Sequence, residues 1–191
     1  MAILLLAVLA GGETDLPVRM AQEAGAVPRG REEGFGVQAF YVHSDFDDGL
    51  KIEAGDGLGV DLLFRWRWNG KTRFGFTIGA AAIDTENDTD ELPIDDDVDV
   101  RQFRAGVGAE FPFSVVELGL SALTGAYRFR RDDENDTSPF LELGASLGFR
   151  PHPMLKVGGF LSAAHTQSSF NRSHTHLFHN YNAGLMVELT F

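Results

Sequence analysis

The sequence predicts an all-β protein, specifically an eight-stranded antiparallel up-and-down transmembrane β-barrel. From residue 35 onward, eight segments alternate apolar and polar residues, as strands with one apolar face do. Their connections alternate between short and long, a pattern typical of membrane barrels that have turns at one end and loops at the other. No stretch contains the ~20 consecutive apolar residues of a membrane-spanning helix.

Composition narrows the classes of protein. A chain of 191 residues suits one domain or at most two. The absence of cysteine excludes disulfides and thiolate metal sites. A net charge of −12 argues against a nucleic-acid partner, because binding phosphates needs a basic surface. The 22 glycines and 16 phenylalanines suit strands and turns.

The first 33 residues of the chain do not alternate. Residues 1–10 form a short apolar run that ends in small residues, so we expect a short or truncated signal peptide, although the usual basic start is missing. Residues 11–33 are polar with scattered proline and glycine, which predicts a flexible arm. The barrel is therefore expected to occupy residues 34–191.

The alternating segments follow one another along the rest of the chain. They cover residues 35–43, 58–70, 72–83, 100–111, 116–129, 140–150, 155–165 and 177–191. Short turns are expected at 68–70, 112–114 and 151–153, and long polar loops at 44–57, 84–99, 130–139 and 166–176. An even number of strands places both chain ends on the short-turn side.

The first short turn can be examined by parity. The apolar residues of its two strands are all even-numbered, and paired residues must face the same side, so paired numbers must sum to an even value. A three-residue turn with Gly70 in the left-handed region pairs Arg65 with Arg73 and satisfies this condition. The sequence therefore predicts a bulged turn.

Two observations indicate that the apolar face points outward. Glycines recur on the polar face, where they would make room inside a narrow barrel. Tryptophans and phenylalanines gather near the short-turn ends, as in an interfacial aromatic girdle. The expected girdle contains Trp66, Trp68, Phe111, Phe149 and Phe191, with Tyr41 and Tyr181 in the girdle at the other interface. If the apolar face pointed inward, a soluble lipocalin-type carrier would result.

The inward face then carries charges whose sign alternates from hairpin to hairpin. The residues are Arg65, Arg67, Arg73, Glu110, Glu117, Arg150, Lys156 and Glu188, with Arg104 and Glu142 one layer further along. Unpaired buried charge is costly, so we expect a cross-barrel ion network that closes the lumen. The alternative is a water-filled lumen with independently solvated charges, which would make the protein a narrow ion channel or porin.

The last ten residues carry a more specific motif. Asn182, Gly184, Val187 and Leu189 precede a terminal Phe191, and this pattern resembles the C-terminal assembly signal of Gram-negative outer-membrane proteins. With eight strands, the chain resembles the small OmpA/OmpX and opacity-type barrels. The resemblance implies a bacterial outer-membrane location and recognition by the barrel-assembly machinery, but no particular activity.

Three groups of polar residues are candidates for binding or catalytic sites. The acidic loop around Asp88, Asp90, Asp95 and Asp97 offers oxygen ligands for a divalent cation, but a run of like charge favours a solvated loop, and no metal site is predicted. Arg128, Arg130 and Arg131 could meet lipopolysaccharide phosphates or pair with neighbouring acids.

The third group is histidine-rich. Lipid A deacylases share this architecture and use a His-x-Ser motif, whereas His165 and Ser168 here are one residue too far apart and fall on opposite faces of a continuing strand. His174 and His176 would be a weak transition-metal pair. The sequence thus predicts a monomeric outer-membrane barrel with a structural or surface-interaction role. No catalytic residues and no cofactor are expected, and its partners are outer-membrane lipid, lipopolysaccharide and an external loop ligand. A deacylase-like hydrolase is the alternative.

Overall fold

A computed structural model describes residues 34–46, 52, 54–68, 72–86, 97–131, 134–168 and 176–191. The predicted signal segment and arm, residues 1–33, lie outside the described residues. The strands are β1 (Gly34–Phe46), β2 (Gly55–Trp68), β3 (Thr72–Glu86), β4 (Asp97–Phe113), β5 (Val116–Arg131), β6 (Glu134–His152), β7 (Leu155–Ser168) and β8 (His176–Thr190).

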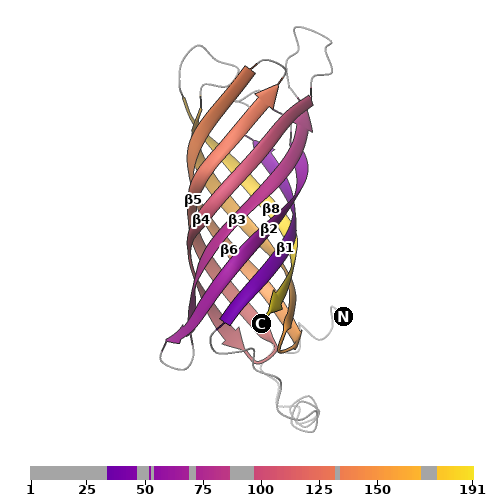
Figure 1. Ribbon diagram of the computed structural model, residues 1–191, viewed down its shortest axis with the longest axis vertical. Coiled ribbons are helices and arrows are strands. Elements are labelled where there is room, and N and C mark those ends of the chain that lie inside the picture. The colour runs from indigo at the N-terminus through magenta and orange to yellow at the C-terminus, as the bar shows by residue number, and fades with distance from the viewer. Residues whose placement is uncertain are drawn as a thin grey trace, which may run out of the picture.

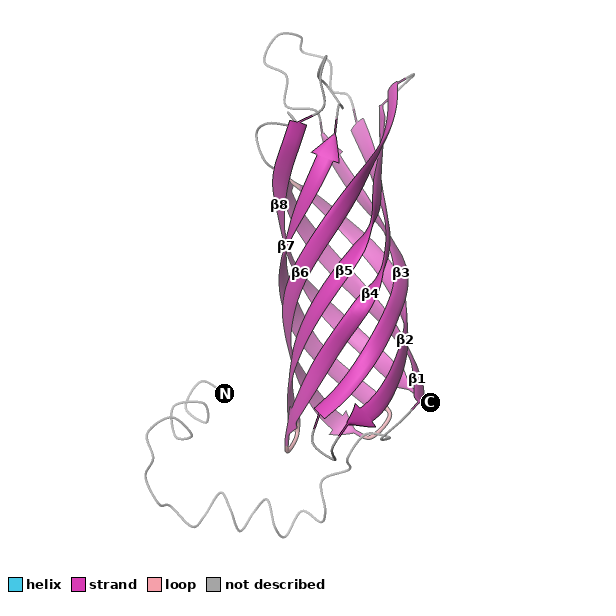
Figure 2. Cartoon of the chain, turned by 90° about the vertical axis from the view of Figure 1, so that its left-hand side faces the viewer, coloured by secondary structure: helices cyan, strands magenta, loops and turns pink. Residues whose placement is uncertain are grey.

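The eight strands form one closed antiparallel barrel in chain order, with β8 paired to β1 (Figure 1). A path from Gly36 that moves to the paired residue on each next strand goes once around the barrel and returns to β1 at Phe46, not at Gly36. The register of the strands is therefore strongly staggered. Such a stagger requires strands tilted against the barrel axis, as Figure 2 shows. The predicted fold class and strand number are confirmed. In the described part of the chain, no helix is long and apolar enough to cross a membrane.

The two ends of the barrel differ. At one end, called the turn end, β4 connects to β5 and β6 to β7 by two-residue turns, and Gly34 and Phe191 lie there as well (Figure 1). Ser114, at the first of these turns, has a φ of 61°. The opposite end, where β1, β3, β5 and β7 finish, is called the loop end.

The strands run further toward the loop end than the alternation predicted. β4 already begins at Asp97. β5 continues to Arg131 and β6 begins at Glu134, so much of the predicted 130–139 loop is strand. The reason is that the inward face becomes apolar there, which allows a paired ladder to continue beyond the segment with an apolar exterior.

The predicted register of the first turn is wrong, although its parity holds. Arg73 pairs with Arg67, and Arg65 pairs with Gly75. β2 continues to Trp68 and β3 begins at Thr72, so residues 69–71 separate the strands. Parity allows every pairing in which the two residue numbers sum to an even value. The strand lengths in the structure show which of these pairings forms. The predicted bulged conformation lies outside the described residues.

Candidate functional site: a closed lumen and a charged rim

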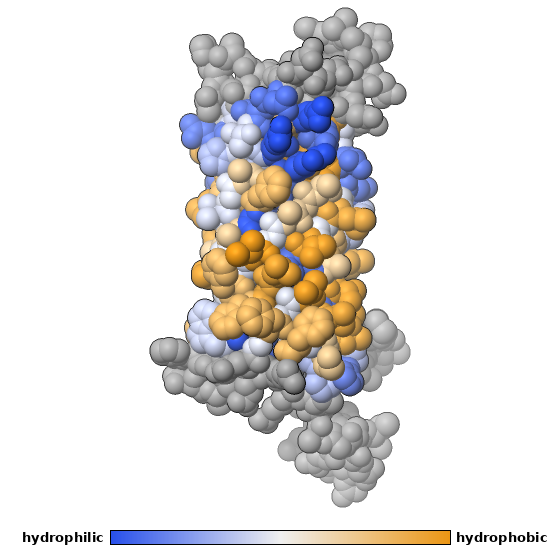
Figure 3. Space-filling view, viewed as in Figure 1, coloured by the Kyte–Doolittle hydropathy of each residue, from blue (hydrophilic) through white to orange (hydrophobic). Residues whose placement is uncertain are grey.

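The barrel exterior is apolar over most of its height. Figure 3 shows this apolar band on the visible face, with hydrophilic side chains above it toward the loop end. Among the most exposed members are Leu58 on β2, Leu143 on β6, Leu161 on β7 and Leu185 on β8. A continuous apolar exterior on a closed barrel is the surface that a bilayer solvates and water does not.

Inside the turn end, charged side chains form one connected group, here called the ion cluster. Its members are Arg65, Arg73, Glu110, Glu117, Arg150, Lys156 and Glu188. Glu188 is fully buried and accepts hydrogen bonds from two Arg65 nitrogens at 2.8 and 2.7 Å. Lys156 Nζ bridges Glu188 at 2.9 Å and Glu110 at 2.6 Å.

The second part of the ion cluster is built around Glu117. Arg150 donates to both Glu117 oxygens at 2.9 and 3.1 Å, and Arg73 donates to one of them. These contacts join β3, β5 and β6, so the cluster crosses the lumen rather than following one hairpin. The side chain of the predicted member Arg67 lies outside the described residues. Each member forms at least one ion pair within the cluster, and together they fill this part of the lumen. Among the described residues, the buried atoms Arg73 Nε and Glu110 Oε2 have no hydrogen-bond partner.

One layer further along the axis, a second ion pair lies across the lumen. Arg104 donates to both oxygens of Asp61 at 3.0 and 2.6 Å, and its guanidinium lies 4.1 Å from the centre of the Phe40 ring. Glu142 lies 3.9 Å from Arg104 and accepts a hydrogen bond from Gln102. The prediction placed Arg104 and Glu142 here but missed Asp61, although Asp61 has the same parity as Arg65 on β2.

A glycine makes room for this pair. A Cβ built at Gly79 would lie 1.8 Å from Asp61 Oδ1, so only glycine fits beside the carboxylate. Between the two charged layers lies a cavity of about 110 Å³, lined by residues that include Thr77, Ser121 and Ser146. A space of this size and polarity suits a few water molecules, not a continuous pore.

The loop end of the lumen is closed by a hydrophobic group that the sequence analysis missed, here called the apolar plug. Its members include Phe46, Ile83, Val98, Val100, Tyr127, Phe129, Phe140 and Phe178. The Tyr127 hydroxyl accepts hydrogen bonds from Asn180 at 2.7 Å and Gln102 at 3.2 Å. A signal was present in the sequence, because the apolar residues of β4 change from odd to even numbers at Val100 and Val98.

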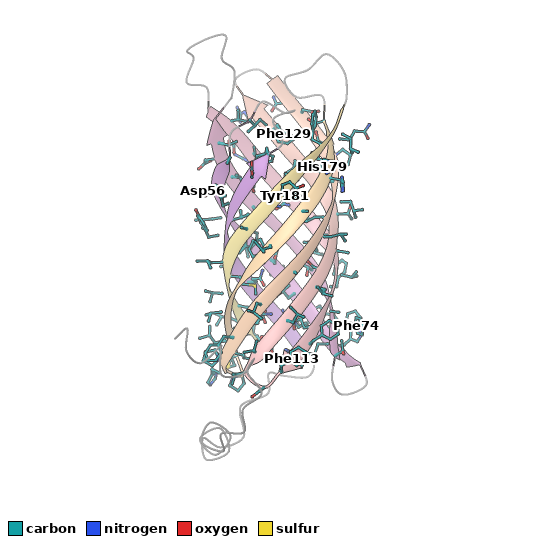
Figure 4. All side chains as sticks on the ribbon, turned by 180° about the vertical axis from the view of Figure 1, so that it is seen from behind. Asp56, Phe74, Phe113, Phe129, His179 and Tyr181 are labelled. Atoms are coloured by element: carbon teal, nitrogen blue, oxygen red, sulfur yellow. The ribbon has the colours of Figure 1, made fainter. Side chains whose placement is uncertain are left out.

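Outside the apolar plug, the exterior is polar. This outer rim consists of His43, Asp56, Asp84, Asp99, Arg101, Arg128, Arg130, His165 and His179. The Tyr41 hydroxyl donates to Asp56 at 2.6 Å, and His43 Nδ1 lies 2.9 Å from the same carboxylate oxygen. These hydrogen bonds, led by that from Tyr41, lower the pKa of Asp56 below its ordinary value. Figure 4 shows Asp56, His179 and Tyr181 toward the loop end.

The predicted girdle residues lie near the two borders of the apolar band. Trp66, Phe149 and Phe191 are exposed at the turn end, Phe111 is half-buried, and the Trp68 side chain lies outside the described residues. Tyr41 and Tyr181 are exposed toward the loop end. Phe113 and Phe74, not predicted as girdle members, are exposed at the turn end as well (Figure 4).

The proposed assembly motif occupies the closing strand β8. Val187, Leu189 and Phe191 face outward, while Gly184 lies on the inner face beside the Phe160 ring. In the register, Val187 pairs with Ala39 and Leu189 with Val37, which closes the barrel against β1.

The described residues form no metal or catalytic site at the positions that the sequence offered as alternatives. Asp88, Asp90, Asp95 and His174 lie outside the described residues, as do the side chains of Asp97, His176 and Arg131. His165 is exposed and its ring centre lies 4.3 Å from that of His179, whereas Ser168 is buried and donates to Asp136 at 2.6 Å. The two residues face opposite sides of β7. Among the described residues, no group of three or more potential ligands is placed to hold a metal.

Comparison with known proteins supports the fold. No protein-family model matches the chain, and neither does any curated protein sequence. The solved structure of Neisserial surface protein A is similar, with 16% identity over 83% of this chain and 97% of that chain and a TM-score of 0.61. The outer-membrane enzyme PagL is similar with 15% identity over 81% and 99% and a TM-score of 0.53. The fold is that of the small outer-membrane β-barrels.

Proposed function

We propose that this chain is a bacterial outer-membrane β-barrel protein with a closed lumen, which acts as a structural and surface-interaction protein at its loop end. The observation that carries the proposal is the pairing of an apolar exterior with an interior of buried, mutually bonded charges. Water solvates an apolar exterior poorly and a bilayer suits it, whereas salt-bridged packing satisfies the interior charges that are removed from water. The C-terminal motif supports recognition by the barrel-assembly machinery.

Two alternatives have less support. A narrow channel needs a continuous wet path, but the ion cluster and the apolar plug each occupy the lumen. A deacylase-like hydrolase needs a base and a nucleophile in contact, but His165 and Ser168 face opposite sides of the barrel wall. Surface interaction through the loop end is therefore the preferred role, with outer-membrane lipid as the surrounding partner and a monomeric barrel as the expected state.

Heat-modifiability and tryptophan quenching test the proposal together. The protein is refolded in detergent, and boiled and unboiled samples are compared on a denaturing gel. A Trp68→Phe variant isolates Trp66 as the only tryptophan. We expect a mobility shift and strong quenching of Trp66 by lipids brominated on the acyl chain. A protein that stays soluble without detergent, with unquenched Trp66, would instead be a soluble carrier.

Conductance across planar bilayers tests the closed lumen. Inserted wild-type protein is expected to give no sustained single-channel steps, because the ion cluster and the apolar plug both fill the lumen. Sustained steps at high insertion density would overturn the closed barrel in favour of the narrow channel.

A further inference from the structure

An open groove of about 1,100 Å³ runs along the outer surface of β8, β1, β2, β3 and β4. It extends from the middle of the apolar band to the outer rim. The register shows its plan: Val60 pairs with Ala80, and Ala80 pairs with Phe103. Two residues nearer the loop end, Ala82 lies between Leu58 and Arg101. The groove therefore changes from apolar to charged along its length.

The apolar part of the groove is a trough over β3. Its floor is made of the small side chains of Ala80 and Ala82. Its walls are Leu58 and Val60 on β2, which are 70% and 51% exposed, and Phe103 on β4, which is 56% exposed. Neighbouring strands are ~4.8 Å apart, so the backbones of the two flanking strands lie about 10 Å apart, and the small alanines between them leave a trough for one acyl chain.

The charged end of the groove is basic on its β4 and β5 side. Arg101 pairs with Arg128, and Asp99 pairs with Arg130. These four residues line a hollow of about 40 Å³, and Asp99 and Arg101 also line the groove. Asp99 accepts a hydrogen bond from Arg101 at 3.1 Å. Within the described part of the chain, Arg128 and Arg130 form no ion pair, so this hollow carries surplus positive charge.

Three acids cross the top of the groove, and only Asp56 lies on its β2 side. Asp84 lies on β3, and Asp99 lies on β4, where Arg101 forms an ion pair with it. Asp56 is hydrogen-bonded to Tyr41 and lies beside His43. Asp84 lies between Asp56 and Asp99 in the register. An anionic group at the top of the groove would therefore favour the side of Arg101 and Arg128 over that of Asp56 and Asp84.

We propose that this groove binds one phosphate-bearing lipid from the leaflet on the loop side, with an acyl chain on Ala80 and Ala82 and its phosphate at Arg101 and Arg128. The inference rests on the proposed membrane location. Arginine forks match phosphate oxygens with paired hydrogen bonds, and basic residues at the membrane surface attract anionic headgroups. The trough directs the chain into the apolar band while the arginines hold the headgroup at its border.

Native mass spectrometry of the refolded protein in detergent measures this binding. Dimyristoyl phosphatidic acid and dimyristoyl phosphatidylcholine are added separately at equal concentrations, because they share acyl chains and differ in headgroup charge and in exposure of the phosphate. We expect the wild type to retain the first lipid about tenfold more tightly, as charge-assisted hydrogen bonds allow. The Arg101→Gln/Arg128→Gln variant is expected to reduce the preference to less than about twofold. The corresponding double lysine variant should keep part of it.

A steric pair of variants tests the trough separately. Ala82→Phe fills the floor and should weaken phosphatidic acid retention severalfold, whereas Ala163→Phe, at a likewise exposed alanine on β7 across the barrel, should leave it unchanged. Equal retention of the two lipids by the wild type, an unchanged preference in the double glutamine variant, or the same loss in both phenylalanine variants would each overturn the inference. A protein with a heat-dependent mobility shift but no lipid preference refutes this site alone, whereas a protein without the shift refutes the membrane location as well.

Discussion

The two halves of the barrel have opposite polarity although the same strands build both. In the half toward the turn end, the exterior is apolar and the interior holds the ion cluster. At the loop end the exterior carries the outer rim and the interior is the apolar plug. β4 shows the change directly, because Phe103 and Val107 are exposed while Val98 and Val100 are fully buried. The difference indicates that the surroundings of the strand change from lipid to water along its length.

The two halves should also depend on different forces. The ion cluster is stabilised by satisfied buried charge, and the apolar plug by the hydrophobic effect and close packing. Single substitutions can separate these contributions when each is paired with a chemically similar substitution in the other environment.

Removing Glu188 is expected to have the largest effect. Glu188→Ala leaves Arg65, Lys156 and Arg150 without their shared acceptor in a buried site. We expect the free energy of unfolding in detergent micelles to fall by about 3–5 kcal/mol, measured by urea titration. The matched control is Asp99→Ala, which removes an exposed ion pair with Arg101 and should change stability by less than about 1 kcal/mol. Equal losses would show that the ion cluster contributes no more than a surface pair.

Truncation of Phe129 should have a comparable or somewhat smaller effect. Phe129 is fully buried in the apolar plug, so Phe129→Ala leaves a cavity and is expected to cost about 3–5 kcal/mol in the same titration. Phe103→Ala, on the exposed apolar band, leaves no internal cavity and should cost clearly less. If the two variants lose the same stability, the loop end of the lumen is not packed as described.

A charge placed on the exterior tests which part of the barrel wall faces lipid and which part faces water. Leu120→Arg introduces a guanidinium in the apolar band and should reduce stability in lipid vesicles by about 2–4 kcal/mol. Gln167→Arg adds the same charge to an exposed position at the loop end of β7, opposite the uncharged Leu177, and should change stability by about 0–1 kcal/mol. A similar effect at both positions would contradict the assigned height of the apolar band.

The smallest expected effect concerns the outer rim. Hydrogen bonds stabilise the charged form of Asp56, so an NMR titration should give a pKa below the model-peptide value of 3.8, and Tyr41→Phe should raise it. The sign follows from linkage: the small stabilisation is present above the unfolded-state pKa and is lost as the pH falls through the lower folded-state pKa. An unchanged pKa in Tyr41→Phe would show that the hydroxyl does not hold this carboxylate.

Much of the fold could be predicted because a strand whose two faces meet different surroundings alternates apolar and polar residues with a strict two-residue period. That period identified the eight segments, and parity placed Arg104 and Glu142 on the inner face. It could not identify the partner of Arg104, because Asp61 reaches it from β2 across β3, and that approach depends on the stagger of the barrel and on Gly79.

The polarity change was missed for a related reason. The two-residue alternation continues through the loop end, but there the apolar residues face inward and the polar residues face outward. The many acidic residues in these segments make them resemble loops. Val100 and Phe129 lie at the ends of predicted segments and Val98 lies in a predicted loop, and only the closed barrel brings the three together.

The local properties follow from the amino-acid sequence alone: the strands, the outward apolar face near the tryptophans and the positions that carry inward charge. These follow from backbone geometry and from the preference of each side chain for lipid or water. The side-chain contacts across the lumen, such as Glu188 between Arg65 and Lys156, arise only in the tertiary structure. The same holds for the alignment of the Ala80–Ala82 trough with Arg101 and Arg128. Such contacts depend on strand stagger and barrel closure, which arise from pairing of all eight strands and are not encoded in any one of them.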